Sequence, residues 1–445
     1  MDKKVEEITV DYTLEQNLCI SCGVCAGVCP VNCIEMQLSK EGDAYRPVID
    51  KERCIRCGKC KRVCPGLGWQ IFEPDESKSL TELSGKGQVL AAYSAWVKDE
   101  ELLKSCVSGG MATVLVKELL EKGVYEKAFL VDSYQINEKL VSKPMEEGFS
   151  YEKTGGSRYT PVSHEEAVRY MRKNREERLI FVGVACAING ILNVIREEKL
   201  NREQYLFIGL FCDKTLNRHV FTYFDSLSEG NLKELYYRSK KQKGWPGNVR
   251  LVFENGEETF LPAGKRMEIK EYMQMRRCLY CYDKLNESCD IALGDNYTKK
   301  DANPGGSNSV IVRTKKGEEA LECVKDKIEK KAALYEDIYQ AQGMTKRNEQ
   351  LEFAQLLREE QGVLLYPEWR ERAFPVSKQA KKQYVLRQAK LKTGQNFEKD
   401  PQAFFAFRKE EEKAKIQRQK REKILGLPRR ILSIPKKVLK KIVKS

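Results

Sequence analysis

The sequence predicts a small α+β unit at the N-terminus, then a larger α/β body with a mostly parallel sheet, and a helical C-terminal tail. Three observations support this. Nine of the sixteen cysteines fall within residues 19–64, in a pattern that repeats. Apolar runs typical of buried strands alternate with helical patterns through the middle of the chain. Residues 346–428 are rich in Glu, Lys, Arg and Gln, which favour helix.

The composition indicates a large chain with enough apolar residues for a packed core. It has 445 residues, 41% of them apolar, and this length suggests two to four domains. No apolar run approaches the ~18–20 residues that a membrane-spanning helix needs. The first residues are polar and lack the apolar stretch of a secretory signal, so we expect a cytoplasmic protein.

The positive charge is concentrated at the C-terminal end. The net charge is +14, and residues 413–445, with thirteen Lys or Arg and one Glu, contribute +12 of it. The remaining residues are close to neutral. This distribution argues against a nucleic-acid-binding core and suggests a tail with a separate role.

The cysteines of residues 19–64 form two equal sets, each with the spacing C-x2-C-x2-C-x3-C-P. The second set follows the first at a constant offset of 35 residues. Three cysteines at this spacing wrap around one [4Fe–4S] cubane, while the fourth binds the other cluster. We therefore predict one cluster on Cys19, Cys22, Cys25 and Cys64, and another on Cys54, Cys57, Cys60 and Cys29.

A zinc site is the main alternative to these clusters. Zinc sites use C-x2-C pairs rather than two runs of four cysteines. The chain has only two histidines, His164 and His219, so any iron is held mainly by sulfur. Over residues 10–70 the sequence resembles bacterial two-cluster ferredoxins, which implies a ferredoxin-like domain at 1–72. A polar linker follows at 73–87. Cys33 is surplus to the pattern and is expected to be a small buried side chain.

Four further cysteines suggest a third cluster in the body. Two predicted strands end in Cys186 and Cys212, and strand C-termini are where α/β sheets place their ligands. Cys278 and Cys281 form a later C-x2-C pair. Together these supply four thiolates, enough for a third cubane. Cys186 and Cys212 could equally be ordinary buried thiols, and spacing alone does not decide between the two.

Residues 88–320 resemble the coenzyme F420 hydrogenase/dehydrogenase beta-subunit family, whose members are flavin- and iron–sulfur-containing reductases. The matching stretches are residues 108–110, 156–159, 182–190, 208–212, the Cys278/Cys281 pair, 291–295 and 307–313. The resemblance implies an N-terminal-like domain at 88–170 and a C-terminal-like domain at 171–345. It also implies bound FAD and a third cluster on Cys186, Cys212, Cys278 and Cys281.

Two glycine-containing stretches are candidates for holding FAD. One precedes a predicted helix, whose first backbone amides suit phosphate. The other could cradle a pyrophosphate, with an arginine supplying charge. Either stretch could instead be an ordinary turn. The candidate residues are Ser108, Gly109, Gly110, Gly156, Ser157, Arg158 and Tyr159.

The sequence departs from the family pattern beside the presumed third cluster. Ala185 and Ala187 flank Cys186 where the family usually has Pro and Gln, and Asp213 follows Cys212 where His is common. These changes put coenzyme F420 as the substrate in doubt and leave the substrate class open. Three other cysteines are expected to be ordinary thiols: Cys106, Cys289 and Cys323.

The C-terminal part is predicted to be a charged helical region at 346–428 followed by a basic amphipathic tail at 429–445. We expect residues 349–359 and 403–423 to form solvated helical surface. The tail alternates apolar pairs with lysines, a pattern typical of helices that lie on anionic membranes. This suggests a peripheral location at the inner membrane surface. The alternatives are a disordered basic tail or a docking helix for an acidic partner.

Together these features predict an iron–sulfur flavoprotein oxidoreductase. Ferredoxin or another redox subunit would be its partner. Electrons would pass between the ferredoxin-type clusters and FAD to an unidentified organic substrate. The alternative is an electron-transfer adaptor that has no substrate and feeds a partner enzyme. Bound flavin distinguishes the two. A third class, a redox-sensing interaction protein, would lose its clusters reversibly in air.

Overall fold

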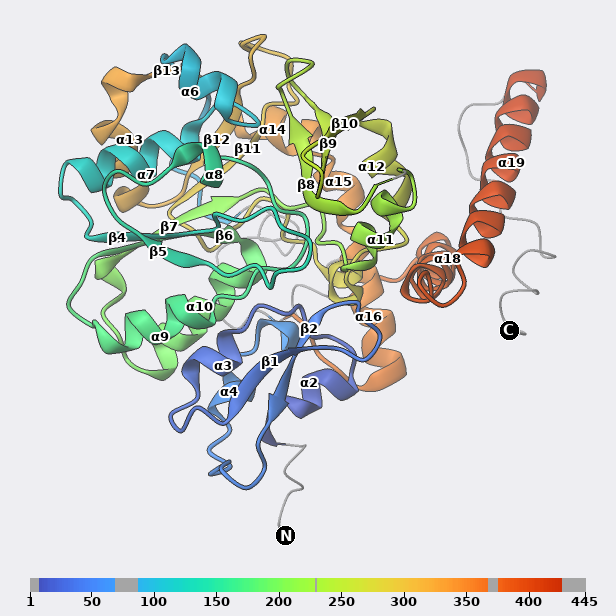
Figure 1. Ribbon diagram of the computed structural model, residues 1–445, viewed down its shortest axis with the longest axis horizontal. Coiled ribbons are helices and arrows are strands. Elements are labelled where there is room, and N and C mark those ends of the chain that lie inside the picture. Colours follow the sequence, from blue (N-terminus) through green and yellow to red (C-terminus); the bar gives the residue numbers. More distant parts are fainter. Residues whose placement is uncertain (1–7, 69–86, 229, 367–374, 426–445) are drawn as a thin grey trace.

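The computed structural model describes residues 8–68, 87–228, 230–366 and 375–425 (Figure 1). The predicted amphipathic tail and nearly all of the predicted linker lie outside these residues. A small N-terminal unit packs below a larger α/β body in Figure 1, and a group of C-terminal helices lies beside both.

The N-terminal unit is a two-stranded antiparallel sheet, with short helices before its first strand and after its second. Strand β1 (Ile34–Leu38) pairs with β2 (Tyr45–Ile49). Helices α3 (Val24–Val28) and α4 (Lys59–Arg62) each follow a glycine in the left-handed region, Gly23 with φ 70° and Gly58 with φ 72°. The 35-residue repeat of the sequence is thus also a repeat of backbone conformation. The other short helices are α2 (Asp11–Glu15) and η1 (Pro65–Leu67).

The body is built on an eight-stranded mixed sheet with the order β13-β3-β12-β11-β7-β6-β4-β5. Its central strands β11, β7, β6 and β4 are mutually parallel, and the strands at both edges pair antiparallel. The predicted parallel sheet is confirmed for this centre. The bounds are β3 (Ala91–Val97), β4 (Lys127–Leu130), β5 (Lys143–Met145), β6 (Leu179–Val184), β7 (Tyr205–Leu210), β11 (Ile291–Asp295), β12 (Asn308–Val312) and β13 (Ile328–Ala332).

Helices cover both faces of this sheet, which explains why its central strands are apolar throughout. On one face, α6 (Glu100–Ser105), α7 (Met111–Glu121) and α13 (Lys315–Cys323) enclose one apolar core. On the other face, α9 (Glu165–Lys173), α10 (Ala185–Glu197) and α14 (Tyr335–Ala341) enclose a second. Val24, Val28 and Val63 of the N-terminal unit belong to this second core. The N-terminal unit is therefore packed onto the body.

A second, three-stranded antiparallel sheet was not foreseen from the sequence. Its strands are β8 (Leu232–Ser239), β9 (Asn248–Phe253) and β10 (Glu258–Leu261). It packs with α11 (His219–Asp225) and α12 (Gly264–Ile269) around a separate apolar core. The remaining short helices are α8 (Tyr151–Thr154), η2 (Arg202–Gln204), η3 (Arg276–Tyr280) and η4 (Lys325–Lys327).

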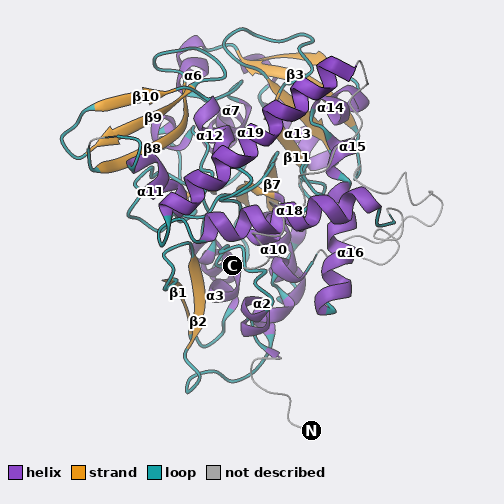
Figure 2. Ribbon diagram, turned by 90° about the vertical axis from the view of Figure 1, so that its right-hand side faces the viewer, coloured by secondary structure: helices purple, strands orange, loops and turns teal. Residues whose placement is uncertain are grey.

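The C-terminal region is helical, and it is only partly the solvated surface that was expected. Its helices are α15 (Met344–Arg347), α16 (Glu349–Gln361), α18 (Lys378–Gln395) and α19 (Pro401–Leu425). Helix α16 buries Leu351, Phe353 and Leu357 completely, so the expectation was wrong for this helix. Helix α19 lies across the body in Figure 2 and buries Phe404 against Tyr272, at 5.2 Å between ring centroids. Among the helices of the described residues, none combines the length and apolarity needed to cross a membrane.

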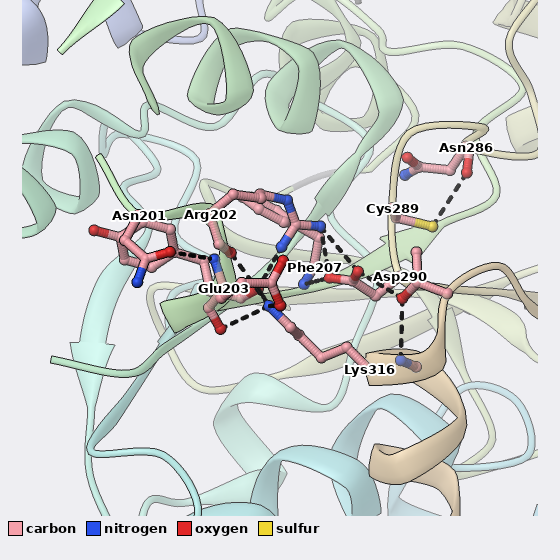
Figure 3. Close-up of polar contacts among 11 residues, drawn as sticks. Asn201, Arg202, Glu203, Phe207, Asn286, Cys289, Asp290 and Lys316 are labelled. Atoms are coloured by element: carbon pink, nitrogen blue, oxygen red, sulfur yellow. Dashed lines mark hydrogen bonds and ion pairs between the residues drawn. The ribbon is translucent and has the colours of Figure 1, made fainter. Parts of the chain in front are cut away.

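A buried carboxylate fixes the N-terminal ends of two central strands (Figure 3). Both oxygens of Asp290 accept hydrogen bonds at 2.9 Å from Nη2 of Arg202. Asp290 also accepts from the amide of Phe207 at 2.8 Å and from Oγ1 of Thr314 at 2.7 Å. The Asp290 side chain is only 2% exposed. It therefore ties β7, the start of β11 and the start of α13 together.

Replacing Asp290 by Ala is expected to lower the free energy of unfolding by about 3–5 kcal/mol, because the Arg202 guanidinium would lose its partner in a mostly buried setting. Chemical denaturation followed by circular dichroism measures this. The matched control is Glu203→Ala, because Glu203 pairs with Lys316 but has an 80% exposed side chain, and exposed pairs contribute little. Equal losses in the two variants would contradict the role given to Asp290.

Candidate functional site

The first group of cysteines gathers Cys19, Cys22 and Cys25 with the distant Cys64. Burial raises the pKa of Cys25 well above its usual value, and the neighbouring Cys22, Cys19 and Cys64 raise it further. The amide of Ser21 donates to Sγ of Cys19, and Oγ1 of Thr13 donates to Sγ of Cys64, both at 3.4 Å. Such donors favour the charged thiolates that a cluster requires. The four sulfurs that the spacing assigns to one cluster therefore lie together.

The second group contains Cys54, Cys57 and Cys60 with Cys29, again as the spacing predicts. These cysteines line one partly open cavity with an empty volume of about 330 Å³. Burial raises the pKa of Cys60 to about 11, and Cys57 and Cys54 contribute. Cys57 is exposed, whereas Cys60 is buried.

Cys33 lies at this second group rather than in an unrelated part of the core. Its Sγ is 3.4 Å from Sγ of Cys29, and its amide donates to that same sulfur at 3.4 Å. It is buried, as expected from the sequence. The spacing gave no sign that its side chain would line the second cavity.

The third group brings together the cysteines that the sequence could not connect. Strands β6 and β7 are parallel neighbours with Val184 opposite Leu210, so the residues that follow them leave the same edge of the sheet. Burial raises the pKa of Cys186 well above its usual value, and Cys212, Cys278 and Cys281 add to the shift in that order. All four thiols are therefore within electrostatic range of one another.

The donor sets fit clusters better than single ions. Within the described residues, no three Cys, His, Asp or Glu side chains converge as the ligands of one metal ion would. Thiolates of a cubane bind separate irons and lie farther apart than ligands that share one ion. Each group offers at least four sulfurs, and the second has Cys33 as a fifth, so the residues present suit [4Fe–4S] clusters.

Buried positive charge surrounds the third group. Burial disfavours the charge of Arg347, but Asp213, Cys281, Cys212 and Cys278 outweigh this effect and raise its pKa. Its Nη1 donates to Oδ1 of Asp213 at 3.0 Å, and its side chain is only 7% exposed. A cubane held by four thiolates is an anion, so a buried arginine would stabilise one bound at this group.

A second buried arginine links the third group to the first. Nε of Arg277 donates to the backbone oxygen of Gly66, two residues after Cys64, at 3.0 Å. Burial disfavours its charge, but Tyr366, Cys281 and Cys186 contribute to a raised pKa. Arg277 thus lies between the N-terminal unit and the third group.

The first and third groups are close neighbours. In addition to Cys212, Cys278 and Cys281, Cys22 of the first group raises the pKa of Cys186. The amide of His164 donates to the backbone oxygen of Cys22 at 2.7 Å. Helix α10, which contains Cys186, packs so tightly on the N-terminal unit that a Cβ at Gly190 would lie 3.0 Å from Val24. The cysteine groups therefore follow one another through the protein in the order second, first, third.

The two stretches proposed for FAD also lie together, around Cys106. A Cβ at Gly110 or at Gly155 would be 3.6 Å from Sγ of Cys106 in both cases. Ser108 is buried, and its Oγ donates to the backbone oxygen of Ser307 at 3.0 Å. Gly109 is needed for packing, because a Cβ there would be 2.8 Å from the Ala95 oxygen.

Only part of this region is arranged to bind phosphate. Within the described residues, the amides of Gly109 and Gly110 donate to no acceptor, and they lie at the start of the eleven-residue helix α7. The Arg158 guanidinium, by contrast, donates to four backbone oxygens, three of them from its own loop: Ser133, Lys153, Thr154 and Gly156. It also stacks on Tyr134 at 3.7 Å. Arg158 therefore holds its own loop rather than facing a ligand.

Sequence reasoning missed a polar network beside these stretches. Arg238 donates to both oxygens of Asp295, at 2.6 and 3.1 Å, at the C-terminal end of β11. Nζ of Lys240 donates to the backbone oxygens of Leu103 and Ser108, both at 2.8 Å. Burial lowers the pKa of Lys240 to about 8. Both cations come from β8 and the residue after it, in the sheet that the sequence did not predict.

The three cysteines without an assigned ligand role in the body lie in different surroundings. Cys289 is buried in the core and donates to the backbone oxygen of Asn286 at 3.1 Å (Figure 3). Cys106 is buried 3.4 Å from Oγ1 of Thr113. Cys323 ends α13. Among the described residues, none of these three joins a group of four sulfurs.

Comparison with known proteins agrees with the class that this geometry suggests, an iron–sulfur protein with an α/β body. A 4Fe–4S dicluster domain matches residues 18–66. The N-terminal and C-terminal parts of the coenzyme F420 hydrogenase/dehydrogenase beta subunit match residues 92–169 and 176–336. The chain belongs to the coenzyme F420 hydrogenase/dehydrogenase beta-subunit family and is an iron–sulfur protein of the oxidoreductase type.

Individual relatives are distant. A coenzyme F420-dependent sulfite reductase of Methanocaldococcus jannaschii is 25% identical over 72% of this chain and 48% of its own length. The chain thus spans about half the length of that relative. One of the F420H2 dehydrogenase subunits of Methanosarcina mazei is 24% identical over 74% of this chain and 87% of its own length. A chain of the F420-reducing [NiFe] hydrogenase complex from Methanosarcina barkeri aligns at a TM-score of 0.46 and 18% identity, covering 61% of this chain and 94% of that one.

Proposed function

We propose that the chain is an electron-transfer oxidoreductase that holds three [4Fe–4S] clusters in a row. The clusters, when bound, supply one-electron transfer. Cys19, Cys22, Cys25 and Cys64 would hold the first, Cys29, Cys54, Cys57 and Cys60 the second, and Cys186, Cys212, Cys278 and Cys281 the third. The observation that carries the proposal is the packing of α10, which contains Cys186, on the N-terminal unit: a Cβ at Gly190 would lie 3.0 Å from Val24, and Cys22 is close enough to raise the pKa of Cys186.

The protein's own residues hold the first and third groups against each other. The N-terminal unit shares an apolar core with α9 and α10, so the first group cannot move away from the third without opening that core. Nδ2 of the buried Asn193 donates to the Val63 oxygen at 3.3 Å and holds α10 against the second repeat. Arg277 fixes the chain beside Cys64 to the loop that carries Cys278 and Cys281.

We further propose that a flavin-type cofactor, FAD, binds near residues 108–110 and 155–159, with coenzyme F420 as the exchange partner. FAD, when bound, supplies the exchange between single electrons and a hydride. The names of the relatives, which refer to coenzyme F420, support the exchange partner. The amides of Gly109 and Gly110, which find no acceptor among the described residues, support phosphate binding, with Lys240 close by. Arg158 is not assigned to the cofactor, because four of its five N–H donors already bind backbone oxygens.

Anaerobic purification with iron, sulfide and flavin quantitation tests both proposals. We expect about twelve irons per chain, since each cluster contains four, together with one flavin. About eight irons would overturn the third cluster while leaving the N-terminal pair. A colourless, iron-free chain would overturn the whole proposal.

The alternative function, an electron-transfer adaptor without its own substrate, makes a different prediction. It shares the three cysteine groups but requires no flavin. Twelve irons without flavin, and no reoxidation of the reduced protein by coenzyme F420, would favour the adaptor. The engagement of Arg158 with its own loop is the specific observation on its side.

A further inference from the structure

The two cysteine loops of the N-terminal unit have the same backbone conformation but differ in the charge of their side chains. Residues 18–30 contain no charged side chain. The equivalent residues 53–65 contain five Lys or Arg and no Asp or Glu, a balance of +5. Because cluster binding requires the same cysteines and glycine in each loop, the charges of the second loop serve some other purpose.

The two loops also face different surroundings. The first loop is buried against the body, where Val24 and Val28 join the core formed by α9 and α10. The second loop presents an exposed thiol, Cys57, and beside it an exposed apolar side chain, Ile55, which is 61% exposed. Electrons that enter or leave through the second cluster therefore have a short route to solvent, whereas the first cluster faces inward.

Further cations extend this face onto the body. A surface hollow is lined by Asn32 and four basic residues from the end of α9 and the turn after it: Arg169, Arg172, Lys173 and Arg175. Nη1 of Arg172 donates to the Gly27 oxygen at 3.0 Å, and Nη2 of Arg53 donates to the Val31 oxygen at 3.0 Å. The hollow therefore adjoins the loop that follows Cys29, and the neighbours of Asn32 in that loop, Val31 and Cys33, line the second cavity together with Ile55.

Among the described residues, only some of these cations have a carboxylate partner. The nearly buried Glu198 pairs with Lys59, Arg172 and Arg175. In the part of the chain that the structure describes, neither Arg56 nor Lys173 makes an ion pair. A carboxylate-rich partner would supply the missing counter-charges, and exposed charges of this kind raise association rates by long-range attraction.

We propose that this cationic face, formed by Ile55, Arg56 and Cys57 together with Asn32, Arg169, Arg172, Lys173 and Arg175, docks a small acidic protein that carries one electron at a time. The proposal rests on the proposed function, since it requires the second cluster. Ile55 provides an apolar centre beside the cluster, and the surrounding cations orient the partner. Such encounters bury little area and depend on charge for their rate.

The test is the rate at which a reduced acidic bacterial ferredoxin reduces the full chain, measured by stopped-flow absorbance at low ionic strength. The variant Arg56→Glu/Lys173→Glu reverses two charges whose side chains hold nothing else in place. We expect its second-order rate to fall at least tenfold, and its salt dependence to weaken. The matched control is Lys104→Glu/Lys325→Glu, whose side chains are 66% and 55% exposed. Lys104 lies in α6 and Lys325 in η4, between α13 and β13, and Figure 1 shows α6, α13 and β13 on the side of the body away from the N-terminal unit.

Two further measurements keep the outcomes distinct. Iron content and the rate of reduction by dithionite should be unchanged in both variants. If the unsubstituted chain lacks iron, the proposed function fails. If iron is present but the ferredoxin rate is unaffected, or falls equally in the control, the docking proposal fails. Binding to phosphatidylglycerol vesicles that depends on Arg56 and Lys173, with an unchanged ferredoxin rate, would also overturn it in favour of a membrane surface.

Discussion

Replacing Cys212 by Ala is expected to remove the third cluster and to disconnect the N-terminal clusters from the body. Iron should fall from about twelve to about eight per chain, because a cubane that loses one of four thiolates is no longer held. Electron delivery from reduced ferredoxin to an acceptor in the body should fall at least a hundredfold. Reduction of the remaining clusters should be unaffected, because their cysteines come from a different part of the chain. Iron analysis and stopped-flow absorbance measure the two effects.

The matched control for this prediction is Cys323→Ala. Cys323 ends α13, on the face of the sheet opposite the N-terminal unit, and is partly exposed like Cys212. It should retain twelve irons and full electron delivery. Retention of twelve irons by Cys212→Ala would mean that another group supplies the fourth ligand. Loss of all iron would mean that the three clusters form only as a unit.

The N-terminal groups could be predicted from sequence because their geometry is local. Two loops of identical spacing adopt the same backbone, down to the left-handed Gly23 and Gly58. The crossed assignment of Cys29 and Cys64 follows from the same spacing, since the fourth cysteine of each run follows a short helix that carries the chain away from its own loop. Tertiary packing contributes little to this arrangement.

The sequence predicts only part of the third group, because its cysteines come together through the order of the strands in the sheet. Cys186 and Cys212 follow two strands, and their proximity depends on β6 and β7 being parallel neighbours. No local pattern shows which two of several strands will be adjacent. Cys278 and Cys281 reach the same edge from η3, after an intervening sheet that the sequence did not indicate.

The charged surroundings of the third group were missed for a similar reason. Helix α16 was read as solvated surface from its Glu and Arg content, yet one stripe of it packs beside Cys186 and Cys281. Arg347 lies in α15, in a segment with many charged residues, and nothing in its neighbourhood distinguishes a buried arginine from an exposed one. Asp213 departs from the family pattern in sequence, and only the structure gives it a partner.

Arg347 should set the reduction potential of the third cluster. It lies among three of the four thiols and carries a fixed positive charge in a buried position. A unit charge about 7 Å from a cluster, at an effective dielectric constant of about 20, changes the free energy of adding one electron by roughly 2 kcal/mol. That is about 100 mV for a one-electron couple. Asp213 offsets part of this charge, but Lys214 and Lys270 also pair with Asp213.

Replacing Arg347 by Gln is therefore expected to lower the midpoint potential of one cluster by up to about 100 mV, without loss of iron. Asp213 keeps two cationic partners and is 41% exposed, so the variant should fold. The measurement is a redox titration followed by electron paramagnetic resonance.

Arg347→Lys keeps the charge and should restore most of the potential, which a purely structural role would not require. An unchanged potential in Arg347→Gln would place the third cluster away from this arginine. The leading influences on the pKa of Arg347 include no sulfur of the N-terminal unit, so its charge should act on the third cluster. A shift shared by all clusters would therefore indicate a general loosening of the protein.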